Sequence, residues 1–174
     1  MKLDMSYEEW KAWKLEEAKR KAHDAEPVDW DDPLYDAKEA IVKLCFGGHL
    51  RFLRLYYIPA DLAKKKPDAA GLYGYGLIMV SKEYYQTHGL DEDMITLLFH
   101  ECAHAYCDNP NPERKIIDTD NDGKHLQTFA EVCEAHGAAC PFNGYDYSTP
   151  QLTEETLAAI RSRLKERTVY NDVG

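Results

Sequence analysis

Residues 94–106 read MITLLFHECAHAY, and this stretch decides the fold. Asp91, Glu92 and Asp93 precede it, and negative charge is stabilising at the start of a helix. The apolar side chains that follow are too dense for a helix with one face in water. We therefore predict a helix through the core, from about residue 91 to the Asn-Pro-Asn-Pro sequence at 109–112.

Two histidines on this helix have the spacing of metal ligands. His100 and His104 are four residues apart, so their imidazoles lie on one side of the helix and can share one ion. Glu101 is rotated by about 100° from His100 and can reach a metal-bound water without being a ligand. This HExxH pattern arises by chance roughly 0.02 times in a chain of this composition. Burying these groups without a metal, bonded only to the backbone, would be costly, so we predict one zinc ion per chain.

A catalytic zinc site generally has three protein ligands and one open position. His125 is the best third candidate, because it is expected to open a second amphipathic helix and to lie about 40° from Phe129 around its axis. The apolar positions of that helix are Leu126, Phe129, Ala130, Cys133 and Gly137. The weaker candidates for the third ligand are Asp108, Glu131, Glu134 and His136.

The acidic sequence DTDNDG at 118–123 imitates the first six positions of a calcium-binding loop. Position twelve of such a loop would be Phe129 instead of the bidentate glutamate that calcium requires. We therefore favour an acidic turn that caps the next helix, and leave weak calcium binding at 118–122 open.

These residues resemble the SprT-like zinc metallopeptidases. The family pattern is HExxHA(W/Y), followed by HxxxF and a glycine at the end of that helix, which matches residues 100–106, 125–129 and Gly137. Residues 76–81, ahead of the first motif, also match in position. The resemblance covers about residues 50–137, roughly half of the chain.

The resemblance implies that His100, His104 and His125 bind zinc and that Glu101 is the catalytic base. The implied activity is that of a zinc metalloendopeptidase acting on a protein or peptide substrate. Many family members have a glycine where this chain has Leu126, and many carry a C-terminal four-cysteine zinc ribbon that this chain lacks. Some relatives associate with DNA, an expectation that comes here from the resemblance alone.

Composition sets outer limits on function. The 174 residues suit one domain, and 44% hydrophobic residues argue against disorder. The longest uncharged stretch, 69–81, is too short to cross a membrane, and the start does not resemble a secretory signal, so we expect a cytoplasmic protein. The net charge of −10 does not support binding to nucleic acid. Five cysteines without a CxxC pair are typical of reduced, buried thiols.

The fold we predict is α+β, with helices packed on a small mixed sheet and a zincin-like active-site helix. Residues 1–48 would form an N-terminal helical segment, and 49–174 the metallopeptidase core of one compact domain. The other elements we expect are a helix of about four turns from Ser6, a helix from Pro33 to the glycines at 47–48, a strand at 50–58, a short helix at 61–66, and a terminal helix at 153–167. We also expect a strand at 71–80 with a glycine-marked bend or bulge.

The proposed chemistry is peptide hydrolysis by a zinc-activated water, with Glu101 as the general base. Substrate would lie along the edge of the strand at 74–80, and Tyr145 or Tyr147 could donate to the oxyanion. A non-proteolytic, zinc-stabilised binding or regulatory module is the alternative. Another HExxH class, with Glu131 as a ligand, would keep the chemistry and change the geometry.

Overall fold

The computed structural model describes residues 16, 20, 25–48, 50, 53–65, 70–74, 76–109 and 111–171. The helix predicted from Ser6 lies almost entirely outside these residues. The described part is α+β, as predicted, and its main sheet is small and mixed. None of its helices has the length and apolar content needed to cross a membrane.

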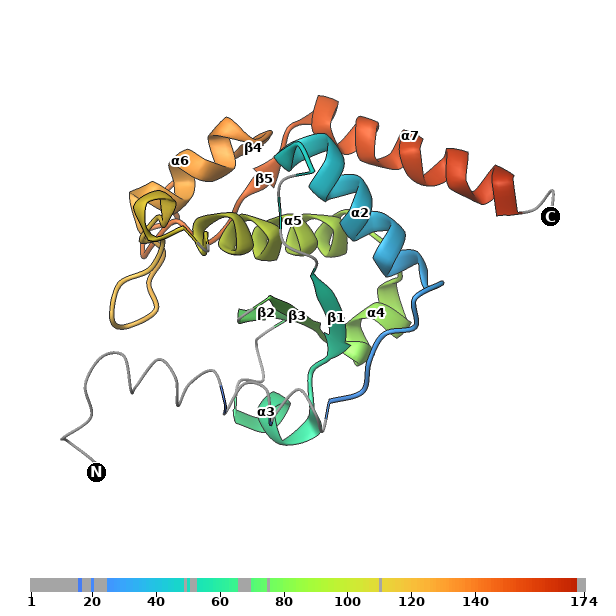
Figure 1. Ribbon diagram of the computed structural model, residues 1–174, viewed down its shortest axis with the longest axis horizontal. Helices are drawn as coiled ribbons and strands as arrows, with labels where there is room; N and C mark the ends of the chain where they lie inside the picture. The colour runs from blue at the N-terminus through green and yellow to red at the C-terminus, as the bar shows by residue number, and fades with distance from the viewer. Residues whose placement is uncertain are drawn as a thin grey trace.

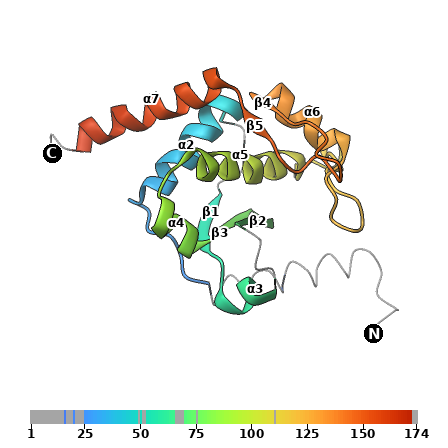
Figure 2. The same ribbon diagram turned by 180° about the vertical axis from the view of Figure 1, so that it is seen from behind.

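Helix α5 (Glu92–Cys107) is the centre of the molecule. Figures 1 and 2 show it between the sheet on one side and helices α6 and α7 on the other. Asp91 caps it by accepting a hydrogen bond from the backbone N–H of Met94 at 2.8 Å. The prediction of a core helix is confirmed by its buried residues, which are Met94, Ile95, Leu98, Phe99, Glu101, Cys102, Ala103 and Cys107.

Helix α2 (Pro33–Phe46) packs against α5 and against α7 (Glu154–Asn171). The side chain of Asp32 accepts a hydrogen bond from the backbone N–H of Leu34 at 2.9 Å. Gly47 ends the helix in the left-handed conformation, with φ of 63°. Leu34 and Ile41 are fully buried in the same hydrophobic core as α5, so residues 33–46 and the metal-binding helix share one core.

The main sheet has the order β1-β3-β2. Strand β1 (Arg54–Tyr57) runs parallel to β3 (Leu77–Val80), and β2 (Gly71–Gly74) runs antiparallel to β3. The prediction of one bent strand over 71–80 is wrong, because the chain reverses after β2 and Gly76 takes a φ of 82° in the turn. Strand β3 is therefore paired on both sides, and β1 and β2 are the strands at the two edges.

The remaining elements are short, and several were not predicted. Helix α3 (Ala60–Lys65) agrees with the short helix expected there. Unpredicted elements are α4 (Lys82–His88), the 3₁₀ turn η1 (Pro112–Arg114), β4 (Ala138–Ala139) and β5 (Gln151–Leu152). Helix α6 (Gln127–Ala135) packs on α5 and carries buried Phe129, Ala130, Val132 and Cys133.

Candidate metal centre

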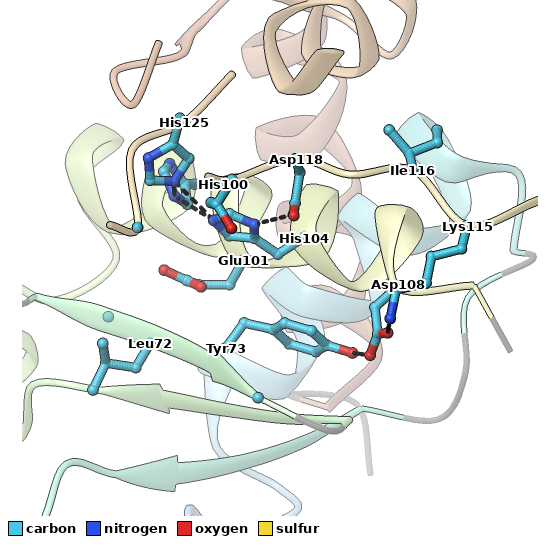
Figure 3. Close-up of a pocket in the computed structure, with 14 residues that line it drawn as sticks. Leu72, Tyr73, His100, Glu101, His104, Asp108, Lys115, Ile116, Asp118 and His125 are labelled. Atoms are coloured by element: carbon cyan, nitrogen blue, oxygen red, sulfur yellow. Dashed lines mark hydrogen bonds and ion pairs between the residues drawn. The ribbon is translucent and has the colours of Figure 1, made fainter. Parts of the chain in front are cut away.

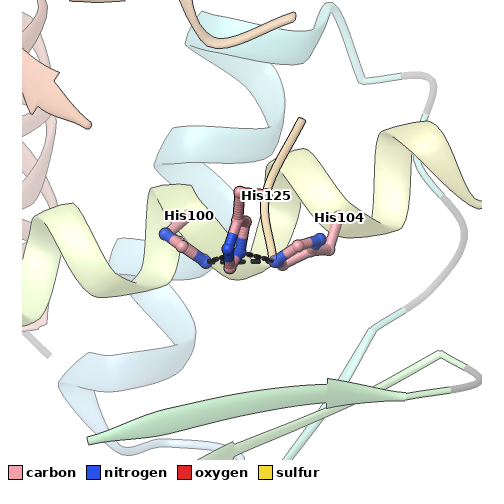
Figure 4. A group of neighbouring side chains, drawn as sticks. All are labelled: His100, His104 and His125. Atoms are coloured by element: carbon pink, nitrogen blue, oxygen red, sulfur yellow. Dashed lines mark hydrogen bonds between the residues drawn. The ribbon is translucent and has the colours of Figure 1, made fainter. Parts of the chain in front are cut away.

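Three imidazoles meet at one point beside α5. His100 and His104 lie one helical turn apart, with their Nε2 atoms separated by 3.0 Å. His125 approaches from a loop, and its Nε2 lies 2.9 Å from that of His104 and 3.1 Å from that of His100. Figure 4 shows the three rings turned toward one another. The structure thus brings together the three histidines named from the sequence as zinc ligands.

His125 reaches this point from a loop, so the prediction that it opens the following helix is wrong. Helix α6 begins at Gln127, and His125 forms an isolated β-bridge with Thr119. The backbone N–H of Leu126 donates to the carbonyl of Asp118 at 2.8 Å. These contacts close the acidic turn, and its closure sets where His125 lies.

Each imidazole also has a partner behind the cluster. The Nδ1 of His104 lies 2.6 Å from a carboxylate oxygen of Asp118, and the Nδ1 of His125 lies 3.2 Å from one of Asp146. His100 bonds to the backbone of Ser148. An imidazole that donates from Nδ1 to a carboxylate keeps, when neutral, its lone pair on Nε2.

With both rings neutral and in this tautomer, the Nε2 atoms of His104 and His125 are both acceptors, and two acceptors 2.9 Å apart repel each other unless a cation or a proton lies between them. Two nitrogen ligands of a tetrahedral zinc, each about 2.0 Å from the ion, are about 3.3 Å apart. The observed triangle of 2.9 to 3.1 Å is close to that value. The donor set therefore fits a metal ion.

Burial favours the neutral, ligand-competent form of His100 and His125. Desolvation lowers the pKa of His100 well below its usual value, and the neighbouring His104 and His125 lower it further. Desolvation also lowers the pKa of His125, followed by the effect of His104. Neutral imidazole is the form that binds metals.

Glu101 lies next to the three rings but bonds to none of them. Its side chain is 4% exposed, and Figure 3 shows it on the side of α5 that faces β2. Burial raises the pKa of Glu101 to about 7, while the proximity of His104 lowers it. A carboxylate in this position can exchange a proton with a group held at the three Nε2 atoms.

The cluster opens into a pocket of about 510 Å³ between α5, β2 and the loop that precedes α6. The pocket is lined by Gly71, Leu72, Tyr73, Gly74, His100, Glu101, His104, Asp108, Lys115, Ile116, Asp118, Thr119, Gly123 and His125. The histidines and Glu101 are thus open to a ligand.

Three polar side chains that line the pocket, Tyr73, Asp108 and Lys115, contact one another. The hydroxyl of Tyr73 donates to Asp108 at 3.0 Å, and Lys115 lies 3.5 Å from the same carboxylate. Figure 3 shows this hydroxyl pointing away from the histidines. Tyr145 and Tyr147, suggested above as oxyanion donors, do not line the pocket.

The weaker candidates for a third ligand lie apart from the cluster. Glu131 and Glu134 are exposed on α6. The ring of His136 stacks on Phe46, with 4.8 Å between ring centroids. Asp108 is engaged with Tyr73 and Lys115.

The acidic turn at 118–123 contacts the histidine cluster through Asp118, and none of its side chains caps α6. The N-cap position of α6 is Leu126, which makes no side-chain capping bond. A carboxylate oxygen of Asp120 accepts hydrogen bonds from the backbone N–H groups of Asp122 and Lys124, at 2.9 and 3.0 Å. The prediction of a helix cap is therefore wrong.

Asp118 and Asp146 were missed as partners of the histidines. The acidic residues at 118–122, just before His125, could have suggested a carboxylate partner for a histidine, but their spacing resembles that of a calcium-binding loop. Asp146 is 21 residues from His125 in the sequence, and its spacing alone predicts no contact with it.

Scans against protein-family models and searches of curated proteins and of solved structures found no match to this chain.

Proposed function

We propose that this protein is a zinc-dependent metalloendopeptidase of the HExxH type, with a zincin-like active-site helix. The observation that carries the proposal is the triangle of three Nε2 atoms, with Glu101 beside it, in the lining of a pocket. The resemblance of residues 100–106 and 125–129 to the SprT-like metallopeptidases supports the same conclusion.

Zinc is the ion we propose, because it prefers nitrogen ligands in a tetrahedral arrangement. A bound zinc would supply a Lewis acid and a water of lowered pKa. The three histidines would hold the ion and leave one position open toward the pocket. A purely structural zinc would need a fourth protein ligand, and among the described residues only these three form a metal-ligand cluster.

Glu101 has the role of a general base. Its carboxylate would accept a proton from the attacking water and pass it to the departing amine nitrogen. Asp118 and Asp146 would hold the rings of His104 and His125, so that the Nε2 lone pairs point to one position.

The substrate we propose is an extended polypeptide beside β2. This strand is one of the two edges of the sheet, and it is the one that lines the pocket, so this placement replaces the expected one along residues 74–80. The backbone N–H of Ser81 donates to the carbonyl of Ala70. Hydrogen-bonded and non-hydrogen-bonded residue pairs alternate along two antiparallel strands, so the backbone N–H and C=O groups of Gly71 and Tyr73 point away from β3. A peptide lying on the free side of β2 can pair with these groups.

The decisive test is Glu101→Gln, which keeps the shape of the side chain and removes the base. We expect one zinc per chain in the wild type and in the variant, with similar thermal unfolding, because Glu101 is not a ligand. Cleavage of unfolded protein substrates should fall by about 10² to 10⁴.

Glu131→Gln is the matched control, because this residue is exposed on α6 outside the pocket, and it should cleave like the wild type. Full activity of Glu101→Gln would refute the mechanism. A wild-type protein that binds zinc and cleaves none of a broad set of proteins would favour the binding-module alternative.

A further inference from the structure

One loop, residues 143–148, contacts two of the three histidines. Asp146 bonds to His125, and the backbone of Ser148 bonds to His100. The loop is also joined to the loop before α6, because the backbone N–H of Tyr147 donates to the carbonyl of His125 at 3.3 Å. The 143–148 loop therefore contacts both His100, which lies on α5, and His125, which lies on the loop before α6.

Asp146 is held firmly at the centre of this loop. It is 6% exposed, and one of its oxygens accepts hydrogen bonds from the backbone N–H of Ser148, from the Ser148 hydroxyl and from the amide of Asn143. These bonds hold the carboxylate of Asp146 in one orientation.

Among the described residues, His125 is the one partner of the other oxygen of Asp146. This oxygen accepts from the backbone N–H of His125 at 3.1 Å and from its ring Nδ1 at 3.2 Å. His100 and His104 are positioned by the regular backbone of α5, whereas His125 lies before α6 and has no helix to position it. Asp146 fixes both the backbone and the ring of this ligand.

We propose that Asp146 is the positioning residue for the third metal ligand, and that the 143–148 loop sets the metal affinity of the site. The inference rests on the metal centre of the proposed function and deepens it. Two effects combine: the paired bonds fix where the His125 ring points, and the buried charge makes its Nε2 a stronger donor to a cation.

The test measures zinc affinity directly, by competition with a chromophoric chelator, in the full chain with Asp146→Asn. Asparagine keeps the shape and an acceptor oxygen but loses the charge. We expect zinc affinity to fall by about 10- to 100-fold. With Co²⁺ in place of zinc, the visible absorption bands should shift, because the His125 ring is held less strictly.

Asp32→Asn is the matched control. Asp32 is also an aspartate that accepts two hydrogen bonds, but its donors are the backbone N–H of Leu34 and the hydroxyl of Tyr85, and it lies outside the pocket. Its zinc affinity and Co²⁺ spectrum should equal those of the wild type. Ser148→Ala removes one bond to Asp146 while keeping the backbone carbonyl, and it should lower zinc affinity less than Asp146→Asn does.

Thermal unfolding with excess chelator separates the fold from the metal site, and Asp146→Asn should there unfold close to the wild type. Zinc affinity of Asp146→Asn within twofold of wild type would overturn the inference and leave the proposed function intact. An equal loss in Asp32→Asn would also overturn it, since the loss would then follow from removing any hydrogen-bonded aspartate. A wild-type chain that binds no zinc would refute the metal centre itself.

Discussion

Asp118 joins the two segments that carry the histidines. Its carboxylate lies 2.6 Å from Nδ1 of His104 on α5, and its backbone carbonyl accepts the N–H of Leu126, the residue after His125. Asp118, the first aspartate of the calcium-like sequence, therefore contacts the candidate ligand His104 with its side chain. Its backbone carbonyl holds the segment that carries His125.

Calcium should not bind well at the acidic turn. Asp118 is engaged with His104, and Asp120 accepts two backbone N–H groups, so two of the aspartates that a calcium loop would use already have partners. We expect a calcium dissociation constant weaker than about 1 mM by isothermal titration calorimetry. Binding tighter than 0.1 mM that Asp122→Asn weakened would contradict this.

His125→Ala should lose the bound metal. Two imidazoles on one helix leave too few protein donors to hold a catalytic zinc tightly, so elemental analysis after dialysis should fall from one zinc per chain to almost none. Glu131→Ala should keep its zinc, because this residue is exposed on α6 outside the cluster. The opposite pattern would transfer the third-ligand role to Glu131.

The sequence predicted those parts of the site that a single helix determines. The i and i+4 spacing of His100 and His104 puts both rings on one side of α5 whatever lies around it. The buried helix followed from the dense apolar residues at 94–99, and its start from Asp91, which caps it.

Apart from the choice of His125 as the third ligand, the parts of the site that depend on tertiary contacts were not predictable from the sequence. His125 lies outside α6, because its backbone pairs with Thr119 across the acidic turn instead of continuing the helix. Asp146 reaches His125 only because the chain returns after α6. The glycine-rich stretch at 71–80 suggested a bend, yet Gly76 permits a full reversal into a hairpin.

DNA binding should be weak. The net charge of −10 opposes phosphate contacts, and the basic run at 64–66 is short, with the side chain of Lys64 exposed. We expect a dissociation constant weaker than about 1 µM for single- and double-stranded DNA at physiological salt. Tighter binding that Lys64→Glu reduced would refute this and would support the association with DNA that the family resemblance implies.

Gly71→Ala should destabilise the protein, because β2 approaches α5 closely at this residue. A Cβ atom on Gly71 would lie 2.7 Å from Cδ1 and 2.9 Å from Cγ of Leu97, so the whole Leu97 side chain would have to move. We expect a loss of about 1 to 3 kcal/mol in the free energy of unfolding, measured with urea. Gly74→Ala is the matched control on the same strand: a Cβ there meets no atom within 4 Å, and its stability should not fall.

A double-mutant cycle with Leu97→Ala tests whether that contact is the cause. Leu97→Ala alone should destabilise the protein, since it removes apolar packing between α5 and β2. In its background Gly71→Ala should cost almost nothing, because the atoms that the new methyl group would strike are gone, and the interaction energy should approach the full cost of Gly71→Ala in the wild type. If the two changes were instead additive, the loss would come from the backbone of β2, and close packing against α5 would not be the reason for glycine at position 71.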